Sequence, residues 1–301
     1  MKFGVREICN VVFKANQDVK IGATNFKKGQ PVLYIDTAKT STVEGAATTV
    51  YAQGGRGNTK LLAWEGEKTL TFTVEDALLS PIGFSILSGA GLLKGASEAE
   101  KVYAHMTTVA YLEVGTQEID LSGALLTGEV IAPTNIFVIK MESDGSITGE
   151  TLALDTAAPA TGQKVKLAAP IAENGACTVM VDYYVMKNSA NVSELQIDAE
   201  RFAGYYYVEA DTLFRTQGEG KDMPANLTFP KVKIQSNFTF NMASTGDPST
   251  FTFTMDAFPG YTLFNPTKQV LCAIQILEDV TTTDEELKSV FGVAESAASV
   301  G

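Results

Sequence analysis

The chain has 301 residues, is 45% hydrophobic and 19% charged, and carries a formal net charge of −12. This length accommodates one large or two ordinary domains, and the composition excludes a disordered chain. The negative charge argues against a surface that grips nucleic acid, because such a surface needs clustered cations. It leaves room for nucleic acid to pass nearby, since an acidic wall repels phosphate.

The cysteines and the apolar segments exclude several other classes. Cys9, Cys177 and Cys272 are odd in number and widely spaced, which predicts neither a disulfide framework nor a zinc site. No apolar signal sequence follows Met1, and the longest uncharged stretch, residues 77–93, is too short to span a membrane. We therefore expect a soluble protein in a reducing, cytoplasmic-type environment.

The first part of the chain predicts strands interrupted by one long loop. Residues 3–20 suit one or two strands, and residues 32–35 suit a short buried strand. Residues 36–58 are small and polar and end in a glycine-rich run, so we expect a long loop of the functional or disordered kind. In residues 61–74, apolar and Thr side chains alternate, which predicts a strand with one buried face.

One convincing helix is predicted in this first half. Glu75 and Asp76 suit the positive end of a helix dipole, and Gly89 suits a C-terminal stop after an apolar run. We predict a helix over residues 75–89 that packs against the sheets. Residues 102–114 predict a further strand.

The middle of the chain predicts a separate domain. Residues 117–200 contain short strand candidates separated by turn signals, a spacing typical of a small β-sandwich. The candidates are residues 129–131, 136–141, 152–154, 164–167, 177–185 and 194–197. We therefore predict an inserted Ig-like domain over residues 117–200, within a discontinuous domain formed by residues 1–116 and 201–279.

The last part of the chain returns to aromatic and Thr-rich strands. Residues 205–215 predict strand structure. Period-two alternation over residues 238–258, around a Gly-Asp-Pro-Ser turn, predicts a β-hairpin with one buried face. Thr283 and Glu286 match a capping box, so we expect a C-terminal helix and mobile tail over residues 280–301.

Residues able to support catalysis are scarce. His105 is the only histidine, so any Ser/His/Asp or Cys/His arrangement would depend on it, and its neighbours predict a strand. The adjacent acids Glu75 and Asp76 are better explained by a helix start. The glycine-rich run at residues 54–58 lacks the Lys-Ser/Thr pair of a phosphate-binding loop. We predict no catalytic, cofactor-binding or metal-binding residue, and no enzyme.

Several runs of turn and aromatic residues resemble a known family. They are Lys28–Asp36, Tyr51–Asn58, Trp64–Lys68, Tyr207–Ala210, Phe214–Arg215, Phe229–Lys233 and Gly246–Ser249. In these runs the chain resembles the major tail tube proteins of contractile-tailed, myovirus-type bacteriophages. The resemblance covers both ends of the chain and leaves residues 117–200 unmatched.

This resemblance implies a fold and an assembly. The fold would be mainly β, a tail-tube fold of two packed antiparallel sheets with a flanking helix, and the inserted domain would decorate the outside. Six subunits would close a ring, and stacked rings would form a channel for DNA. The partners would be further copies of the chain, tail sheath, baseplate and tail terminator proteins, and DNA transiently in the lumen, with no membrane. The protein would reside in the virion tail after synthesis in the host cytoplasm.

The resemblance also implies where copies meet. Residues 36–58 would be the stacking loop, and residues 238–257 would belong to the sheet near the channel. The expected contact residues between subunits or rings are Lys39, Tyr51, Gly54, Gly55, Arg56, Asn58, Phe214, Arg215 and Asp247. Two other functions stay open: a virion surface β-sandwich module that binds carbohydrate or a receptor, and an enzyme such as a glycoside hydrolase.

Overall fold

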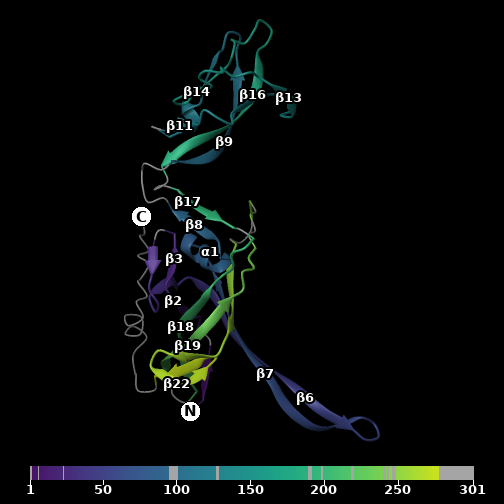
Figure 1. Cartoon of the computed structure of the whole chain (residues 1–301), viewed down its shortest axis with the longest axis vertical. Helices are drawn as coiled ribbons and strands as arrows, with labels where there is room; N and C mark the ends of the chain where they lie inside the picture. Colours follow the sequence, from purple (N-terminus) through teal and green to yellow (C-terminus); the bar gives the residue numbers. More distant parts are fainter. Residues whose placement is uncertain are drawn as a thin grey trace. The chain divides into compact units, whose positions relative to one another are not determined.

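The computed structural model divides the chain into two compact units. Unit 1 combines Met1–Leu92 with Leu195–Gly301, and unit 2 is Leu93–Glu194 (Figure 1). The structure describes residues 2–277 except residues 6, 23, 95–100, 127–128, 189–191, 198, 218–219, 240–241, 243 and 246–248. With 60% strand and 4% helix, the fold is mainly β, which confirms the predicted fold class.

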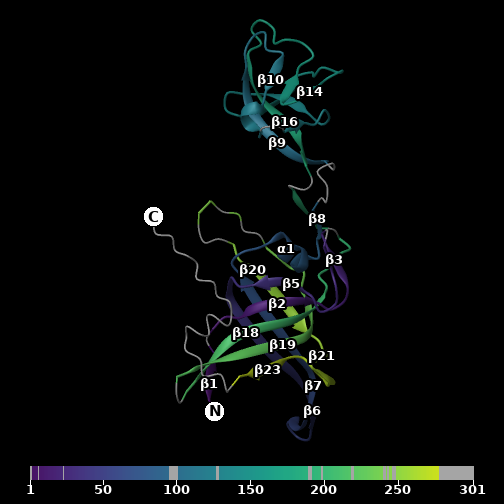
Figure 2. The same cartoon turned by 90° about the vertical axis from the view of Figure 1, so that its left-hand side faces the viewer.

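Unit 1 is built on one nine-stranded antiparallel sheet in which β5, β2, β18, β19, β20, β7 and β6 follow one another, with β1 on β18 and β23 on β19. Figure 2 shows β2, β18 and β19 side by side. The bounds in this sheet are β1 (Phe3–Val5), β2 (Asn10–Ala15), β5 (Pro31–Ile35), β6 (Ala38–Gly54), β7 (Thr59–Asp76), β18 (Tyr205–Thr216), β19 (Asp222–Ile234), β20 (Phe251–Ala257) and β23 (Ala273–Ile276). Short two-stranded pairs complete the strands: β3 (Val19–Ile21) with β4 (Thr24–Phe26), β8 (Gly91–Lys94) with β17 (Ser193–Gln196), and β21 (Gly260–Thr262) with β22 (Asn265–Val270).

One face of the large sheet forms the core of unit 1. Phe13, Phe72, Phe229 and Phe253 are at most 1% exposed, and the rings of Phe72 and Phe229 stack with their centroids 4.7 Å apart. Because successive side chains of a strand point to opposite faces, the Thr residues between these aromatics lie on the other face. The alternation over residues 70–76 and 251–257 therefore indicates a sheet that is buried on one side.

The helix α1 (Pro81–Ser88) packs Ile86 and Leu87 into the same core. Ser80 caps its first turn, with its Oγ accepting a hydrogen bond from the backbone N–H of Gly83 at 3.0 Å. The helix ends at Gly89, as predicted. Its predicted start at Glu75 is wrong, because β7 continues through Asp76.

The predictions for residues 36–58 and 238–258 need correction. Residues 36–58 are largely a strand, β6, because β7 pairs with them almost throughout and supplies their backbone hydrogen bonds. In residues 238–258 only β20 is a described strand, and its partners are β7 and β19. Period-two alternation identifies a strand but does not choose its neighbour. The predicted helix and tail over residues 280–301 lie outside the described residues.

Unit 2 consists of a five-stranded and a three-stranded antiparallel sheet that share one core. In the larger sheet β16 lies between β9 on one side and β11 and β12 on the other, and β13 follows β12. The bounds are β9 (Lys101–Leu112), β10 (Glu118–Asp120), the 3-10 helix η1 (Ser122–Ala124), β11 (Val130–Ile131), β12 (Phe137–Met141), β13 (Ile147–Thr151), β14 (Ala160–Thr161), β15 (Lys164–Lys166) and β16 (Cys177–Asn188). Val138, Val165 and Val181 are fully buried between the sheets. Unit 2 begins and ends earlier in the chain than the domain predicted over residues 117–200. It begins earlier because β9 pairs along its length with β16.

Candidate assembly interface

The hairpin of β6 and β7 extends beyond the sheet of unit 1. β20 pairs with β7 only at Thr71–Asp76, so the stretch of β7 before Thr71 has β6 as its single strand neighbour among the described residues. We call the part of the hairpin from Gly45 to Leu70 the arm (Figure 1). A two-stranded ribbon is at best marginally stable in water by itself. The arm is therefore a segment that a partner surface would stabilise.

The tip of the arm is shaped by residues in the left-handed region. Gly55, Gly57 and Asn58 have φ values of 80°, 92° and 50°. Glycine adopts this conformation at no steric cost, and Asn tolerates it better than most residues. The backbone N–H of Asn58 also donates to the carbonyl of Gly55 at 3.2 Å. The predicted contact residues at the tip thus have a structural role in closing the hairpin.

Large apolar side chains of the arm face solvent. Val50, Leu61, Leu62 and Trp64 are 62%, 64%, 61% and 54% exposed. Trp64 lies directly opposite Val50, and Leu62 lies opposite Ala52, which places these cross-strand pairs on one face of the ribbon. A contiguous exposed apolar group of this kind marks a site of interaction.

Cationic groups accompany these apolar side chains near the tip. The ammonium of Lys60 lies 3.7 Å from the ring centroid of Tyr51, a cation–π contact. Arg56 is exposed in the turn itself. The distal arm therefore offers an apolar surface with positive charge at its end.

The solvent face of the sheet beside the arm has different chemistry. Three cross-strand rows run over β6, β7 and β20, and their members are Glu44–Thr71–Asp256, Thr42–Thr73–Thr254 and Thr40–Glu75–Thr252. We call these nine residues the Thr/acid face. These nine residues include three carboxylates and no cationic side chain, and the first row continues onto β19 at Lys233, which lies opposite Asp256.

Glu75 and Asp256 of the Thr/acid face accept hydrogen bonds from neighbouring side chains. Glu75 accepts hydrogen bonds from the hydroxyls of Thr250 and Thr40, and these bonds, that of Thr250 first, lower its pKa. The carboxylate of Asp256 accepts from Thr71 at 3.3 Å and from the amide of Gln235 at 3.1 Å. For Glu75 such bonds favour the charged form of the acid.

The structure brings most of the predicted contact residues together. Lys39, Tyr51, Gly54, Gly55, Arg56 and Asn58 all lie on the hairpin. Phe214 and Arg215 lie on β18 instead. Phe214 is 6% exposed and stacks on Phe3 with the centroids 5.2 Å apart, and Arg215 donates through Nε and Nη2 to the carboxylate of Asp222. Asp247 lies outside the described residues.

The apolar residues of the arm were missed by sequence reasoning. The sequence pattern of residues 61–74 predicts one strand with a single buried face. The signal was nevertheless present, because Leu61, Leu62 and Trp64 break the alternation that begins at Leu70. Apolar side chains on consecutive strand positions must point to both faces, and a strand outside the core cannot bury both.

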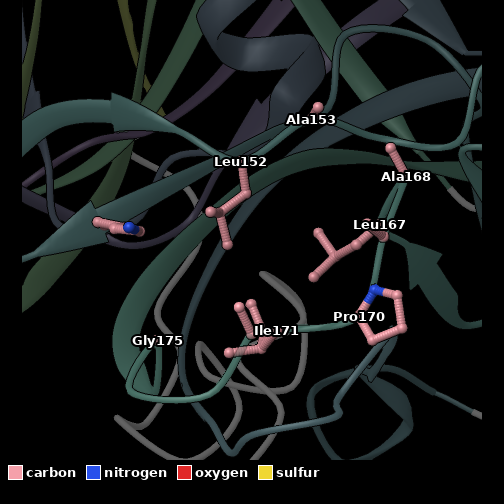
Figure 3. Close-up of a pocket in the computed structure, with 10 residues that line it drawn as sticks. Leu152, Ala153, Leu167, Ala168, Pro170, Ile171 and Gly175 are labelled. Atoms are coloured by element: carbon pink, nitrogen blue, oxygen red, sulfur yellow. The ribbon is translucent and has the colours of Figure 1, made fainter.

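A hollow of about 290 Å³ lies in unit 2 (Figure 3). Leu152, Leu167 and Ile171 point into it. Lys140 also lines it, and its ammonium pairs with Glu150 at 2.6 Å. Its lining is thus mainly apolar and offers no nucleophile or free acid. Within the described part of the chain no group of His, Cys, Asp and Glu residues could hold a metal ion. No helix there has the length and hydrophobicity needed to cross a bilayer.

Comparison with known proteins identifies the family. No curated protein matches the chain. The model of the YomU/Tube protein family matches residues 17–265, which include both strands of the arm and the Thr/acid face. The match covers most of the chain and runs through unit 2. The chain therefore belongs to the YomU/Tube protein family, a family of phage tube proteins.

Proposed function

We propose that this chain is the subunit of a phage tail tube that forms stacked hexameric rings around a channel for DNA. Membership of a phage tube family supports the general class. The arm carries the proposal further, because its exposed apolar residues need a partner surface that a single copy does not supply. In a stack of rings, the arm of each subunit would lie on a subunit of the next ring. The tail would be contractile, with sheath, baseplate and tail terminator proteins as further partners.

The Thr/acid face supports a role for the sheet as the wall of the channel. Its carboxylates repel the phosphates of passing DNA, and its Thr hydroxyls are polar without being cationic. These nine residues therefore offer passing DNA no strong attraction. Closing the sheets of neighbouring subunits into one barrel would also cover the exposed edges at β5 and β6.

Unit 2 interrupts unit 1 between Leu92 and Leu195. We infer that it is an inserted module on the outside of the tube. A module there leaves both the ring contacts and the channel to unit 1.

The arm is tested by removing its apolar side chains. In a variant with Leu61→Ser, Leu62→Ser and Trp64→Ser, each lost burial is worth about 1 kcal/mol, half the value of a fully buried side chain. A loss of about 3 kcal/mol per contact raises the concentration needed for assembly by about a hundredfold. Assembly is measured by negative-stain electron microscopy and sedimentation over a concentration series.

A matched control makes the same kind of change elsewhere. Phe137 and Ile147 of unit 2 are 51% and 53% exposed. A Phe137→Ser, Ile147→Ser variant should assemble as the wild type does. Tubes that form equally well from the arm variant would refute the assigned role of the arm.

The channel wall is tested by reversing its charge. Tubes in which Glu44, Glu75 and Asp256 are replaced by Lys should retain labelled duplex DNA at low salt, whereas wild-type tubes should not. Added salt should release the DNA, since it screens the new attraction. If the reversed tubes retain no more DNA than wild-type tubes, the Thr/acid face does not line the channel.

A further inference from the structure

The strand β9 forms an open edge of the larger sheet in unit 2. Among the described residues its backbone pairs with β16 alone, through a continuous register from Cys177↔Leu112 to Asn188↔Lys101. From Val102 to Leu112, the opposite side of β9 therefore presents backbone N–H and C=O groups that pair with no other described strand. A long, regular edge of this kind is a template for pairing with another strand.

The core of unit 2 is incomplete along this edge. On β16 the inward side chains Val181, Tyr183 and Val185 are fully buried. Directly opposite them on β9, the inward Thr108, Met106 and Ala104 are only half-buried. An additional strand beside β9 would cover these inward side chains.

The outward face of β9 is also unusually apolar. Tyr103, Val109 and Tyr111 are 60%, 60% and 64% exposed. Between residues 102 and 112 the one ionisable group besides the Tyr hydroxyls is His105, whose Nε2 lies 2.5 Å from the carboxylate of Asp182 on β16. The edge thus lacks the charged residues that commonly prevent edge-to-edge pairing.

The opposite edge of the same sheet is protected. β13 pairs with β12 through an irregular register between Ile139 and Met141, and Gly149 within β13 has a φ of 81°. Glu150 adds a charge on this strand. Irregularity and charge both discourage pairing. The contrast indicates that the regular edge at β9 serves a contact.

The sequence of β9 is nearly symmetrical about Thr107. Tyr103 and Tyr111 stand four residues to either side, and Ala104 and Ala110 stand three residues to either side. An antiparallel pair of identical strands places residues at equal distances from the two-fold axis opposite each other. A second copy is therefore the partner that this strand fits best.

We propose that β9 pairs antiparallel with β9 of a second copy of the chain, about a two-fold axis at Thr107. Tyr103 then lies opposite Tyr111 of the partner subunit, and His105 lies opposite Val109 of the partner subunit. Cross-strand aromatic pairs stabilise a sheet, and about ten new backbone hydrogen bonds close the edge. The two larger sheets become one continuous sheet. This contact is separate from the tube contacts proposed for unit 1.

The contact is tested by disulfide trapping in the full-length protein. Residues directly opposite each other in an antiparallel pair lie about 5 Å apart between Cα atoms, which a disulfide can bridge. Thr107→Cys should therefore form a disulfide-linked dimer on mild oxidation. It should form at least ten times more dimer than Thr151→Cys, which places an exposed thiol on the β13 edge. Wild-type protein, oxidised in the same way, is the control for cross-linking through the three native cysteines.

The register and the Tyr103–Tyr111 pair are tested with three further variants. A mixture of His105→Cys and Val109→Cys chains should form the mixed disulfide dimer. Each variant alone should not, because identical positions then lie about 13 Å apart along the strand. Adding Tyr111→Lys to Thr107→Cys should reduce the dimer at least tenfold.

Two results would overturn the proposal. One is a folded Thr107→Cys protein, judged by circular dichroism, that yields no more dimer than Thr151→Cys. The other is an equal yield of dimer from the single variants and from the mixture of His105→Cys and Val109→Cys, which would indicate random collision. Because this contact is separate from the tube contacts of unit 1, either result would overturn it and leave the tube function standing.

Discussion

Replacing Gly89 by Ala tests how the sheet and α1 are held together in unit 1. Gly89 ends α1 with a φ of 74°, and a Cβ at this position would lie 2.3 Å from the carbonyl carbon of Phe202 and 2.6 Å from the nitrogen of Ala203. A side chain in the left-handed region costs roughly 1–2 kcal/mol. Separating the two backbone segments adds about 1–3 kcal/mol, as for overpacking. The total is about 3 kcal/mol.

The assay is thermal and urea unfolding of the full-length protein, followed by circular dichroism. A loss of about 3 kcal/mol lowers Tm by about 6–12 °C for a unit of this size. Gly29→Ala is the matched control, because Gly29 has a φ of 83° in the same unit and no atom within 4 Å of its Cβ position. The Gly29→Ala variant should lose about 1 kcal/mol of unfolding free energy, the cost of a side chain in the left-handed region alone. Equal losses in the two variants would refute the reasoning, because the close approach of residues 202–203 would then have no energetic consequence.

Three other variants test the core, the helix cap and a charge pair. Phe72→Ala removes a ring that is fully buried and stacked on Phe229, so it should destabilise unit 1 by about 3–5 kcal/mol in urea unfolding. Ser80→Ala removes the cap of α1 and should cost about 1 kcal/mol in the same assay. The ammonium of Lys166, with two backbone N–H groups, lowers the pKa of Asp155 from 3.8 to about 2. The resulting stability is present above pH 3.8 and is lost as the pH falls toward 2, so the wild-type stability of unit 2 should approach that of Asp155→Asn over this range in pH-dependent unfolding. A constant difference between these two proteins from pH 4 to pH 2 would contradict the assignment.

The sequence predicts the fold well where a strand has one buried face. Strands at residues 32–35, 205–215 and 251–257 are confirmed, because alternation of apolar and polar residues is the direct imprint of a half-buried sheet. The start of the helix is wrong for a related reason. Asp76 accepts a hydrogen bond from the hydroxyl of Thr37 at 2.5 Å and lies at the end of β7, so an acid that suits a helix start serves a strand end.

The candidate interface is harder to predict because its strands bury almost nothing. Nearly every residue of β6 is exposed, so no apolar pattern distinguishes this strand from a loop. Its structure comes from pairing with β7, which is a long-range property of the chain. The glycine-rich tip is an exception. The run at residues 54–58 indicates a turn from composition alone, and the positive φ values of Gly55, Gly57 and Asn58 account for it.

The arm and the net charge of the chain act in opposite directions. A charge of −12 keeps separate copies apart in solution, which opposes the association that exposed Leu61, Leu62 and Trp64 favour. Burial of these side chains acts only over contact distance, whereas the repulsion extends over about 10 Å at moderate salt. Copies therefore associate only when a geometry offers several apolar contacts at once. Positive charge at Lys60 and Arg56 reduces the repulsion where the arm meets an acidic neighbour. The same acidic charge that discourages random association would, on the Thr/acid face, prevent DNA from adhering.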